Sequence, residues 1–539
     1  MIKCFSSLIL VFFLLITGCA PEKELEPEIL HVDVSERVLI PLTQKLTLPD
    51  TSKLGKQTFV IRENTRVYAS SGNEPLAIAQ RFVNQFNKAS IFKIENAIIT
   101  AEIGEEGVYF MIDSIPELMY KKEGYTIQSA NRRLVIKAIH PSGLYRGLQT
   151  IKQLLPSQIE SKESVSDSIN WAVPGLTIID YPEYEYRGAM LDVARHFFSV
   201  EDVKRYIDLI AQYKLNTLHL HLTDDQGWRI EIKSWPKLTT IGGKTAVGGG
   251  KGGFYTQEDY KEIVEYATQN YIAIIPEIDM PGHSNAALVS YAELNCNGIS
   301  PVMYTGMRVG FSSFCVDKEL TYKFIDDVIR ELAAMTPGEY IHLGGDESQA
   351  TSDADYVKFL NRVAPIVAKY NKKVMGWEDI SIMDVNEETI VQHWTAANKA
   401  ELGVSKGAKV VLSPAPKTYL DMKYNDTTRI GLRWAGPTAV DSAYLWNPKS
   451  ILKDVPHEAI LGIESPLWSE TAVTIDDVEY LAFPRIIGHA EMGWSAPASL
   501  KWESYKNRLK QHQSRMDLQG INYYKSPKIF LTDSIKLKE

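Results

Sequence analysis

From about residue 186 onward, short apolar runs alternate with longer stretches in which apolar residues recur every three or four positions. The short runs have the length and β-branched content of buried strands, and we count eight of them: RGAMLDVA, NTLHLHL, IAIIPEID, YIHLGG, KVMGWE, TIVQHW, AKVVLS and AILGIES. Between them lie helical stretches such as VEDVKRYIDLIAQYKL, and Ser199 with Glu201 and Asp202 behind it predicts a helix start. Eight strand–helix units over roughly 310 residues indicate an α/β protein with a (β/α)₈ TIM barrel.

The pattern differs between about residues 35 and 180, where strand-like and helix-like stretches mix. RVLIPLTQKLTL, GYTIQS and RRLVIKAIH are expected strands, the last two forming a hairpin that turns at residues 130–132. EPLAIAQRFVNQFNK and GLYRGLQTIKQLL have helical apolar spacing. We therefore expect a smaller α+β domain over residues 35–180, the barrel over residues 181–500 and a helical tail over residues 501–539.

The first residues carry the pattern of an export signal. Lys3 precedes an apolar run at residues 8–16, which is too short to span a bilayer. The sequence Ile-Thr-Gly-Cys that ends at Cys19 resembles a bacterial lipobox. This predicts a lipoprotein signal peptide at residues 1–18, a lipid on Cys19, an acidic tether at residues 19–34 and anchorage to a bacterial membrane. The alternative is an ordinary secretory signal with an incidental cysteine, and the membrane face stays open.

Composition and cysteine content narrow the classes of partner. The 539 residues are 45% hydrophobic and 23% charged, which is typical of a globular protein with two or three buried domains. A net charge of -9 argues against a nucleic-acid partner, which usually requires a basic surface. Outside the N-terminal segment only Cys296 and Cys315 remain. In an export compartment they are able to form a disulfide, and two separate buried thiols are the alternative.

Polar and aromatic side chains follow every predicted barrel strand. Because TIM-barrel active sites form at the C-terminal ends of the strands, we expect these side chains to meet on one rim. In strand order they are Arg195 and His196; Asp224 and Asp225; His283; Asp346 and Glu347; Trp377 and Glu378; Trp394; Tyr419 and Asp421; Trp468 and Glu470. Each taken alone is more often structural than functional. Together they predict a saccharide pocket, since indoles cover the C–H faces of a sugar while carboxylates and arginine bind its hydroxyls.

Two adjacent acids, Asp346 and Glu347, follow the fourth strand in the sequence HLGGDE. A two-carboxylate glycosidase places its carboxyl groups about 5 to 5.5 Å apart for retention and about 6.5 to 9.5 Å apart for inversion. Successive residues that leave a strand point in different directions, so the pair is expected to address different parts of one sugar. Gly344 and Gly345 are expected to let substrate approach the backbone closely. A tight turn with two solvated acids is the alternative.

Eight segments in register resemble the β-N-acetylhexosaminidases of glycoside hydrolase family 20. They are YRGAMLDVARHF, NTLHLHLTDDQGWRIEI, GGFYTQEDYKEIVEYA, PEIDMPGHS, HLGGDE, GWED, LGIESPLWSE and FPRIIGHAEMGWS, spread over residues 181–496. The upstream segment EGYTIQSANRRLVIKAIHPSGLYRGLQTIKQLL resembles that family's N-terminal domain. The resemblance implies removal of terminal β-linked GlcNAc or GalNAc from glycans with retention. The nucleophile would be the substrate's own 2-acetamido oxygen, and neither a cofactor nor a metal ion is expected.

The resemblance also implies a role for each matching residue. Glu347 would be the general acid, Asp346 would hold the acetamido N–H, and Tyr419 would bind the acetamido oxygen. The remaining roles are pocket walls for Trp377, Trp394 and Trp468, hydroxyl binding for Arg195, Asp421 and Glu470, and support of the acid for Asp224 and His283. One departure is visible, because the expected GWDE reads GWED in this chain and leaves the role of Glu378 open.

Two other classes of function compete with this one. The H-x-H pair His219 and His221, together with His283, His342 and Asp346, is compatible with a metal-dependent amidohydrolase barrel, although the pair is expected in mid-strand. The second competing class is a lipoprotein that only binds amino-sugar glycans, but such a protein would not need a poised acid. The natural glycan, the preference between GlcNAc and GalNAc, and the oligomeric state stay open. Discrimination among glycans is expected in loops such as residues 241–254 and 296–314.

Overall fold

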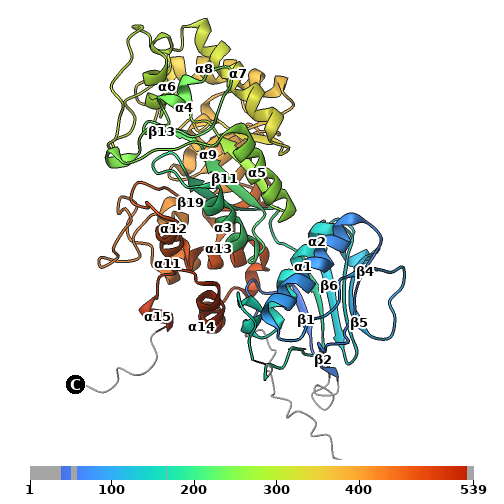
Figure 1. Ribbon diagram of the computed structural model, residues 1–539. Helices are drawn as coiled ribbons and strands as arrows, with labels where there is room; N and C mark the ends of the chain where they lie inside the picture. The colour runs from blue at the N-terminus through green and yellow to red at the C-terminus, as the bar shows by residue number, and fades with distance from the viewer. Residues whose placement is uncertain (1–37, 50–56, 167, 531–539) are drawn as a thin grey trace, which may run out of the picture. The chain divides into compact units, whose positions relative to one another are not determined.

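The computed structural model describes residues 38–49, 57–166 and 168–530 (Figure 1). The expected signal peptide, the lipidation site Cys19 and the acidic tether lie outside the described residues. Among the described residues, no helix combines the length and the apolar character needed to cross a bilayer.

A closed barrel of eight parallel strands forms the larger part of the described chain, which confirms the predicted (β/α)₈ fold. The strands are β10 (Tyr186–Asp192), β11 (Thr217–His221), β14 (Ala273–Glu277), β15 (Tyr340–His342), β16 (Lys373–Trp377), β17 (Ile390–His393), β18 (Lys409–Leu412) and β19 (Ile460–Leu467). Pairing of β10 with β19 closes the barrel. Each strand coincides with one of the apolar runs, although β10 begins one residue before its run and β19 ends two residues after its run. A strand that is buried on both faces must be apolar nearly throughout.

The strand register builds a polar layer near the C-terminal end of the barrel. His221 at the end of β11 pairs with Asp192 on one side and with Glu277 of β14 on the other. Glu277 in turn pairs with His342 at the end of β15. Four titratable side chains from neighbouring strands therefore share one level of the barrel, directly below the loops that follow the strands.

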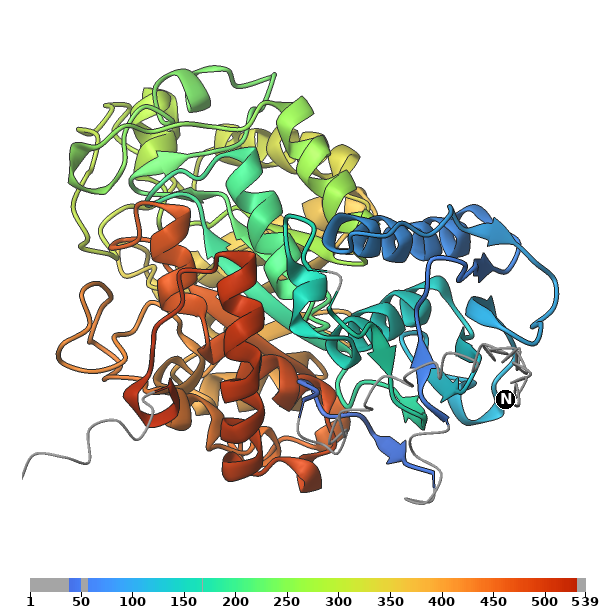
Figure 2. The ribbon, with the colours of Figure 1, turned by 60° about the horizontal axis from the view of Figure 1, so that its bottom comes forward.

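Helices between the strands complete the barrel. They include α3 (Val200–Ala211), α5 (Gln257–Gln269), α7 (Glu319–Met335), α8 (Asp353–Lys369) and α9 (Ala397–Ser405), and α12 (Ile475–Ala482) and α13 (Arg485–Trp494) follow the last strand. The predicted start of α3 is a capping box, in which the Ser199 side chain accepts from the Asp202 N–H and Asp202 accepts from the Ser199 N–H. After the barrel the chain forms α14 (Trp502–Gln519) and α15 (Pro527–Phe530), with α14 prominent in Figure 2.

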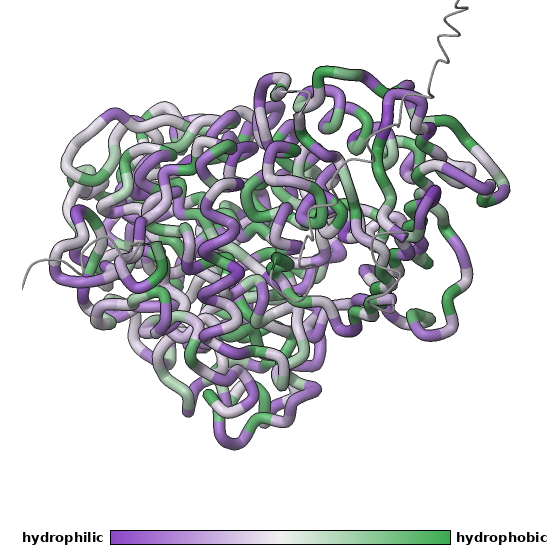
Figure 3. Tube along the Cα trace, turned by 90° about the horizontal axis from the view of Figure 1, so that it is seen from below, coloured by the Kyte–Doolittle hydropathy of each residue, from purple (hydrophilic) through white to green (hydrophobic). Residues whose placement is uncertain are grey.

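The N-terminal part of the described chain is a mixed sheet with the strand order β1-β9-β6-β7-β5-β3-β4. Its elements are β1 (Lys45–Thr47), β3 (Val67–Ala69), α1 (Asn73–Ala89), β4 (Ile98–Ile99), β5 (Gly107–Ile112), β6 (Tyr125–Ala130), β7 (Arg133–Ala138), α2 (Pro141–Leu154) and β9 (Leu176–Asp180). Strands β6 and β7 form the expected hairpin. Helices α1 and α2 pack against each other and against the sheet. Figure 3 shows polar and apolar stretches alternating along the chain throughout both parts.

The expected strand RVLIPLTQKLTL is wrong for most of its length, since only Lys45–Thr47 joins the sheet. Upstream of β1, side chains satisfy the backbone instead of a neighbouring strand. The Ile40 N–H donates to the Gln153 side chain, which donates back to the Ile40 carbonyl, and the Leu42 N–H donates to Glu491. Pro41 also lacks an N–H for a ladder. An apolar run alone does not distinguish these two ways of pairing a buried backbone.

Candidate active site

A cavity of about 520 Å³ is lined by residues that follow the barrel strands. Seven of the side chains that the sequence singles out line it: Arg195, Asp346, Glu347, Trp394, Tyr419, Trp468 and Glu470. They come from the segments after β10, β15, β17, β18 and β19. Residues separated by up to 275 positions in the chain therefore converge on one hollow, because the C-terminal ends of parallel barrel strands meet at one rim.

Four other predicted site residues lie behind this lining. Trp377 is fully buried and packs against Trp468, with 5.7 Å between the ring centroids. Asp421, Asp224 and His283 are each at most 2% exposed. Asp224 and His283 would act on a ligand in the cavity through their contacts with the lining residues Arg195 and Glu347.

The two adjacent acids differ in their exposure. The Asp346 side chain is 9% exposed and the Glu347 side chain 28%. Glu347 adopts a left-handed backbone with φ of 47°, which is uncommon for a residue with a Cβ and is typical of functional positions. The turn sets one acid deep in the cavity and brings the other towards its mouth.

The glycines before the acids have a different purpose from the one the sequence indicates. A Cβ on Gly344 would collide with the carboxylate of Asp279, and one on Gly345 would lie 2.7 Å from Ile380. Both residues have positive φ, 64° and 96°. Protein atoms occupy the space beside them, so the glycines allow this tight packing and do not provide a path for substrate.

His283 lies between the acids and a buried ion pair. Its Nε2 is 3.5 Å from Glu347 Oε2 and 3.9 Å from Asp346 Oδ2, while its Nδ1 is 3.2 Å from Asp224 Oδ1. Asp224 Oδ2 is 2.7 Å from Arg195 Nη2. Burial alone would lower the pKa of His283, but the carboxylates of Asp224 and Asp279 raise it well above its usual value. The imidazole therefore stays charged next to Glu347.

Asp346 carries an unusual charge state for an aspartate. Burial is the main cause that raises its pKa to about 7, Glu347 raises it further, and His283 opposes both. Its Oδ1 is buried and has no hydrogen-bond partner among the described residues. A buried oxygen without a partner is rare in native proteins, and here it is available to a donor that enters the cavity.

Hydrogen-bonding atoms without partners also gather at the other side of the cavity. In the described chain, both oxygens of Asp421, Oε2 of Glu470 and Nε of Arg195 are buried and unpaired. Burial and the nearby charge of Glu470 raise the pKa of Asp421 well above its usual value. A ligand that carries several hydroxyl groups would satisfy all of these atoms at once.

Aromatic rings form the walls of the cavity. The Tyr419 and Trp468 rings lie 6.3 Å apart, and the guanidinium of Arg195 lies 4.8 Å above the Trp468 ring. Trp434, which the sequence interpretation missed, lies 6.0 Å from Trp394 and 5.7 Å from Tyr419. Its side chain is 54% exposed, so it extends the wall outwards. The only sequence signal for it was a tryptophan in the long loop after the seventh strand.

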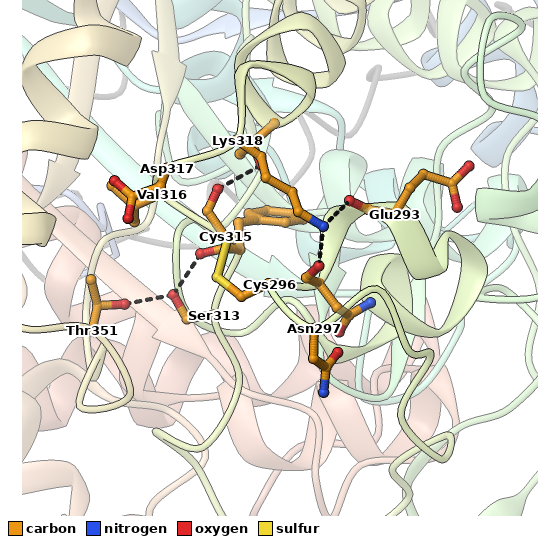
Figure 4. Close-up of a disulfide and its surroundings, with 12 residues drawn as sticks. Glu293, Cys296, Asn297, Ser313, Cys315, Val316, Asp317, Lys318 and Thr351 are labelled. Carbon is orange, nitrogen blue, oxygen red and sulfur yellow. Dashed lines mark hydrogen bonds between the residues drawn. A yellow bond between two sulfur atoms is a disulfide. The ribbon is translucent and has the colours of Figure 1, made fainter.

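The sequence interpretation also missed Met307, Val309, Thr395 and Leu432, which complete the lining. Met307 and Val309 belong to a loop that the disulfide between Cys296 and Cys315 closes, with a Cα–Cα distance of 4.8 Å (Figure 4). The Thr305 carbonyl of this loop accepts from the N–H of Gly248, which links it to the glycine-rich loop. Both loops expected to discriminate among glycans are thus joined beside the cavity.

The sequence GWED now has a structural explanation. Glu378 is buried and accepts hydrogen bonds from the backbone N–H groups of Trp394 at 2.9 Å, Thr395 at 3.0 Å and Ala396, and pairs with His393 Nδ1 at 2.6 Å. Asp379 accepts from the indole N–H of Trp394 at 3.2 Å. One acid therefore fixes the backbone of Trp394 and the next fixes its ring.

We expect Glu378→Gln to raise KM for a cavity ligand by about 5- to 30-fold, because an amide N–H facing three backbone donors costs about 1 to 2 kcal/mol and releases Trp394. Asp379→Asn is the matched variant, since it keeps the backbone anchor and should change KM less. Steady-state kinetics would measure both. If KM were the same for Glu378→Gln and the wild type, Glu378 would not be the residue that holds Trp394 in place for ligand binding.

The histidines that fit a metal-dependent barrel face carboxylates. His219 lies 3.0 Å from both Glu277 and Glu464, and His221, the last residue of β11 and not a mid-strand residue, lies 2.5 Å from Glu277 and 2.9 Å from Asp224. His219, Glu277 and His342 lie close enough together to hold an ion. Nδ1 of His219 lies 3.0 Å from Glu464 and Nδ1 of His342 lies 3.0 Å from Glu277, so these nitrogens already belong to a buried network with the carboxylates.

The fold and the site together define a glycoside hydrolase built on a (β/α)₈ barrel. The chain belongs to glycosyl hydrolase family 20: the model of that family's catalytic domain matches residues 184–497, and the model of its domain 2 matches residues 40–181.

Relatives and solved structures agree with this assignment. A β-N-acetylhexosaminidase of Cellulomonas fimi is 40% identical over 410 residues, which is 76% of this chain and 81% of that protein. The structure of the GH20 β-N-acetylhexosaminidase from Streptomyces coelicolor superposes with a TM-score of 0.87 at 44% identity, covering 92% of this chain and 99% of that one. A mutant Streptomyces plicatus β-hexosaminidase in complex with its product GlcNAc superposes with a TM-score of 0.86 at 45% identity, covering 92% and 98%.

Proposed function

We propose that this chain is an exo-acting β-N-acetylhexosaminidase that removes terminal β-linked GlcNAc or GalNAc from glycans with retention. The observation that carries the proposal is the unequal pair of acids. Glu347 is partly exposed beside His283, whereas Asp346 is buried with an unpaired Oδ1. One group is suited to proton transfer at the mouth of the cavity and the other to a fixed contact inside it.

In the first step Glu347 protonates the glycosidic oxygen as the bond from that oxygen to C1 breaks. The 2-acetamido oxygen of the substrate attacks C1 from the opposite face, which requires an equatorial acetamido group and a β-linked leaving group. Asp346 accepts a hydrogen bond from the acetamido N–H and stabilises the positive charge of the oxazolinium intermediate. Tyr419 donates to the acetamido oxygen and orients it for attack.

In the second step the Glu347 carboxylate takes a proton from water while the water oxygen attacks C1. The bond from C1 to the acetamido oxygen breaks, and the second inversion gives net retention. Holding nucleophile and electrophile in one molecule replaces an entropic cost of about 7 kcal/mol, which corresponds to an effective molarity near 10⁵ M. The buried Asp421, Glu470 and Arg195 would bind the ring hydroxyls, and Trp377, Trp394 and Trp468 would enclose the acetamido group and the ring.

The test compares how fast the purified protein releases nitrophenol from three substrates: the nitrophenyl β-N-acetylglucosaminide, the β-N-acetylgalactosaminide and the plain β-glucoside. We expect cleavage of at least one acetamido sugar, no cleavage of the glucoside and no effect of a metal chelator. Comparable cleavage of the glucoside would mean that an enzyme carboxylate is the nucleophile. Loss of activity with the chelator would favour metal-dependent chemistry instead.

We propose separately that Cys19 carries a lipid that anchors the protein to a bacterial membrane. Support comes from the apolar run at residues 8–16 followed by the lipobox-like sequence that ends at Cys19. Each buried acyl CH₂ contributes about 0.8 kcal/mol to membrane attachment, so two or more chains hold a protein stably. The acidic residues that follow Cys19 would then act as a tether.

We expect Cys19→Ser to move the protein from the membrane fraction to the soluble fraction without a change in specific activity. Cys4→Ser is the matched control, because it alters another cysteine of the same segment and should leave the protein in the membrane fraction. Fractionation with immunoblotting measures the distribution. Retention of Cys19→Ser in membranes would show that lipid on this residue is not the anchor.

A further inference from the structure

We propose that Glu277 is a positioning residue that holds both Trp377, which lies behind the aromatic wall of the cavity, and the network behind the general acid. The proposal rests on the function proposed above, because it assigns Glu277 an action on Glu347 and Trp377. Glu277 is the last residue of β14 and is fully buried in the barrel interior. It does not line the cavity, and a ligand there would not touch it.

The two oxygens of Glu277 serve different halves of the site. Oε1 accepts a hydrogen bond from the indole N–H of Trp377 at 3.0 Å. Oε2 pairs with His221 Nδ1 at 2.5 Å and lies 3.0 Å from His219 Nε2. Because a carboxylate is rigid and planar, the orientation of the Trp377 ring and that of the His221 ring are fixed by the same group.

From Oε2 a continuous row of imidazoles and carboxylates leads to the acid. His221 Nε2 is 2.9 Å from Asp224 Oδ2, and Asp224 Oδ1 is 3.2 Å from His283 Nδ1. His283 Nε2 is then 3.5 Å from Glu347 Oε2. Every member of the row before Glu347 is at most 2% exposed, so water does not screen these contacts.

From Oε1 the second arm leads to the sugar-binding wall. Trp377 packs against Trp468, which lines the cavity, and His342 packs edge-on against Trp377 with 5.2 Å between centroids. Without an acceptor for its N–H, the buried indole would carry an unpaired donor, which favours rotation of the ring. Displacement of Trp377 would move the wall that encloses the ligand.

Charges on every neighbouring strand bear on Glu277. They are His219 and His221 on β11, Asp279 after β14, His342 on β15, Asp346 after β15, and Glu464 on β19 beyond His219. Burial alone would raise the pKa of Glu277, but the three histidines hold it well below its usual value. The group is therefore an anion throughout the working range, and a neutral replacement would leave His221 without its counter-charge.

Glu464 offers a matched control within the same barrel interior. It is as deeply buried as Glu277 and bonds His219 at 3.0 Å, Gln392 at 2.7 Å and Tyr186, but it contacts neither His221 nor Trp377. Removing its charge perturbs the barrel core and reaches Glu277 only through the shared His219, without direct contact with His221 or Trp377. Glu277→Gln and Glu464→Gln thus separate a general loss of stability from a loss of positioning.

The experiment measures three quantities for each variant: the melting temperature, the affinity for GlcNAc by calorimetry, and the ratio of kcat/KM between a dinitrophenyl and an alkyl β-N-acetylglucosaminide. We expect Glu277→Gln to weaken GlcNAc binding and to raise the leaving-group ratio by about 10- to 100-fold, since loss of hydrogen bonds to charged groups has this effect on an equilibrium. Only the alkyl leaving group needs full protonation. Glu464→Gln should lower the melting temperature and leave both the ratio and the affinity unchanged.

Two further variants test the arms one at a time and keep the proposal testable if Glu277→Gln does not fold. His221→Gln interrupts the row to the acid and should raise the leaving-group ratio with little change in GlcNAc affinity. Trp377→Phe removes only the indole N–H and the second ring, and should do the reverse. A Glu277→Gln protein that matches Glu464→Gln, or a His221→Gln protein with an unchanged ratio, would overturn the proposal. An inactive wild type would instead refute the proposed function, and the GlcNAc affinities would still test the Trp377 arm.

Discussion

Replacing Glu347 by Gln is expected to reduce kcat on an alkyl β-N-acetylhexosaminide by about 10³-fold, within the range of 10² to 10⁴ that proton transfer by a positioned acid supplies. The amide has nearly the shape of the acid but no proton to give, and it cannot accept one from water. The first loss slows departure of a poor leaving group, and the second slows breakdown of the oxazolinium intermediate. Affinity for GlcNAc should change little, because Glu347 lies at the mouth of the cavity.

A leaving-group series makes this result specific. A dinitrophenyl group departs without protonation, so the first step in Glu347→Gln should remain fast with that substrate and the intermediate should accumulate as a burst. The matched control is Glu339→Gln, at the opposite end of β15, whose side chain is 68% exposed. It should behave as wild type. Full activity of Glu347→Gln on the alkyl glycoside would remove Glu347 from the role of acid.

The second large effect is expected from Asp346→Asn, which should lower kcat by about 10²- to 10³-fold, the usual loss when one preorganised charge at a reacting centre is removed. The amide keeps the volume of the side chain but no longer stabilises the positive oxazolinium. It also offers an N–H where the acetamido N–H must donate. The loss should therefore appear with alkyl and dinitrophenyl substrates alike, which distinguishes it from the loss in Glu347→Gln.

Stability gives an independent check on Asp346. Its pKa of about 7 in the folded protein exceeds the value of about 3.9 in an unfolded chain, so the folded state holds the proton more tightly between these values. The stabilisation that this proton provides is complete below about pH 4 and is lost as the pH rises through 7. Asp346→Asn should thus melt at a higher temperature than wild type at pH 8, and the difference should shrink at pH 5. If Asp346→Asn melted at a lower temperature than the wild type at pH 8, this would contradict the raised pKa of the buried Asp346.

The alternation of apolar runs and helical stretches was sufficient to predict the barrel, because each parallel strand is buried on both faces and each helix on one. It was also sufficient to bring Arg195, Asp346, Tyr419 and Glu470 to one cavity, since the topology alone gathers the strand ends. The alternation did not predict contacts that depend on the course of the loops. Trp434 and Met307 line the cavity from long loops, whose course no periodic pattern specifies.

The sequence also did not predict the contacts that side chains make inside the barrel. The segment PEID drew attention only to His283 downstream, yet its Glu277 contacts His221 and Trp377, and its Asp279 fills the space beside Gly344. A buried carboxylate is recognised by its partners, and these come from other strands. Strand register supplies that information, and register is a property of the closed barrel.

The measurement that tests the account most directly follows kcat/KM for nitrophenyl β-glucosaminides whose 2-acetamido group carries none, one, two or three fluorines. Each fluorine withdraws electrons from the carbonyl oxygen and hardly changes the size of the group. If that oxygen is the nucleophile, kcat/KM must fall steeply along the series, by a large factor with every fluorine. A flat series would show that the acetamido group only binds, and would contradict substrate-assisted catalysis by this enzyme.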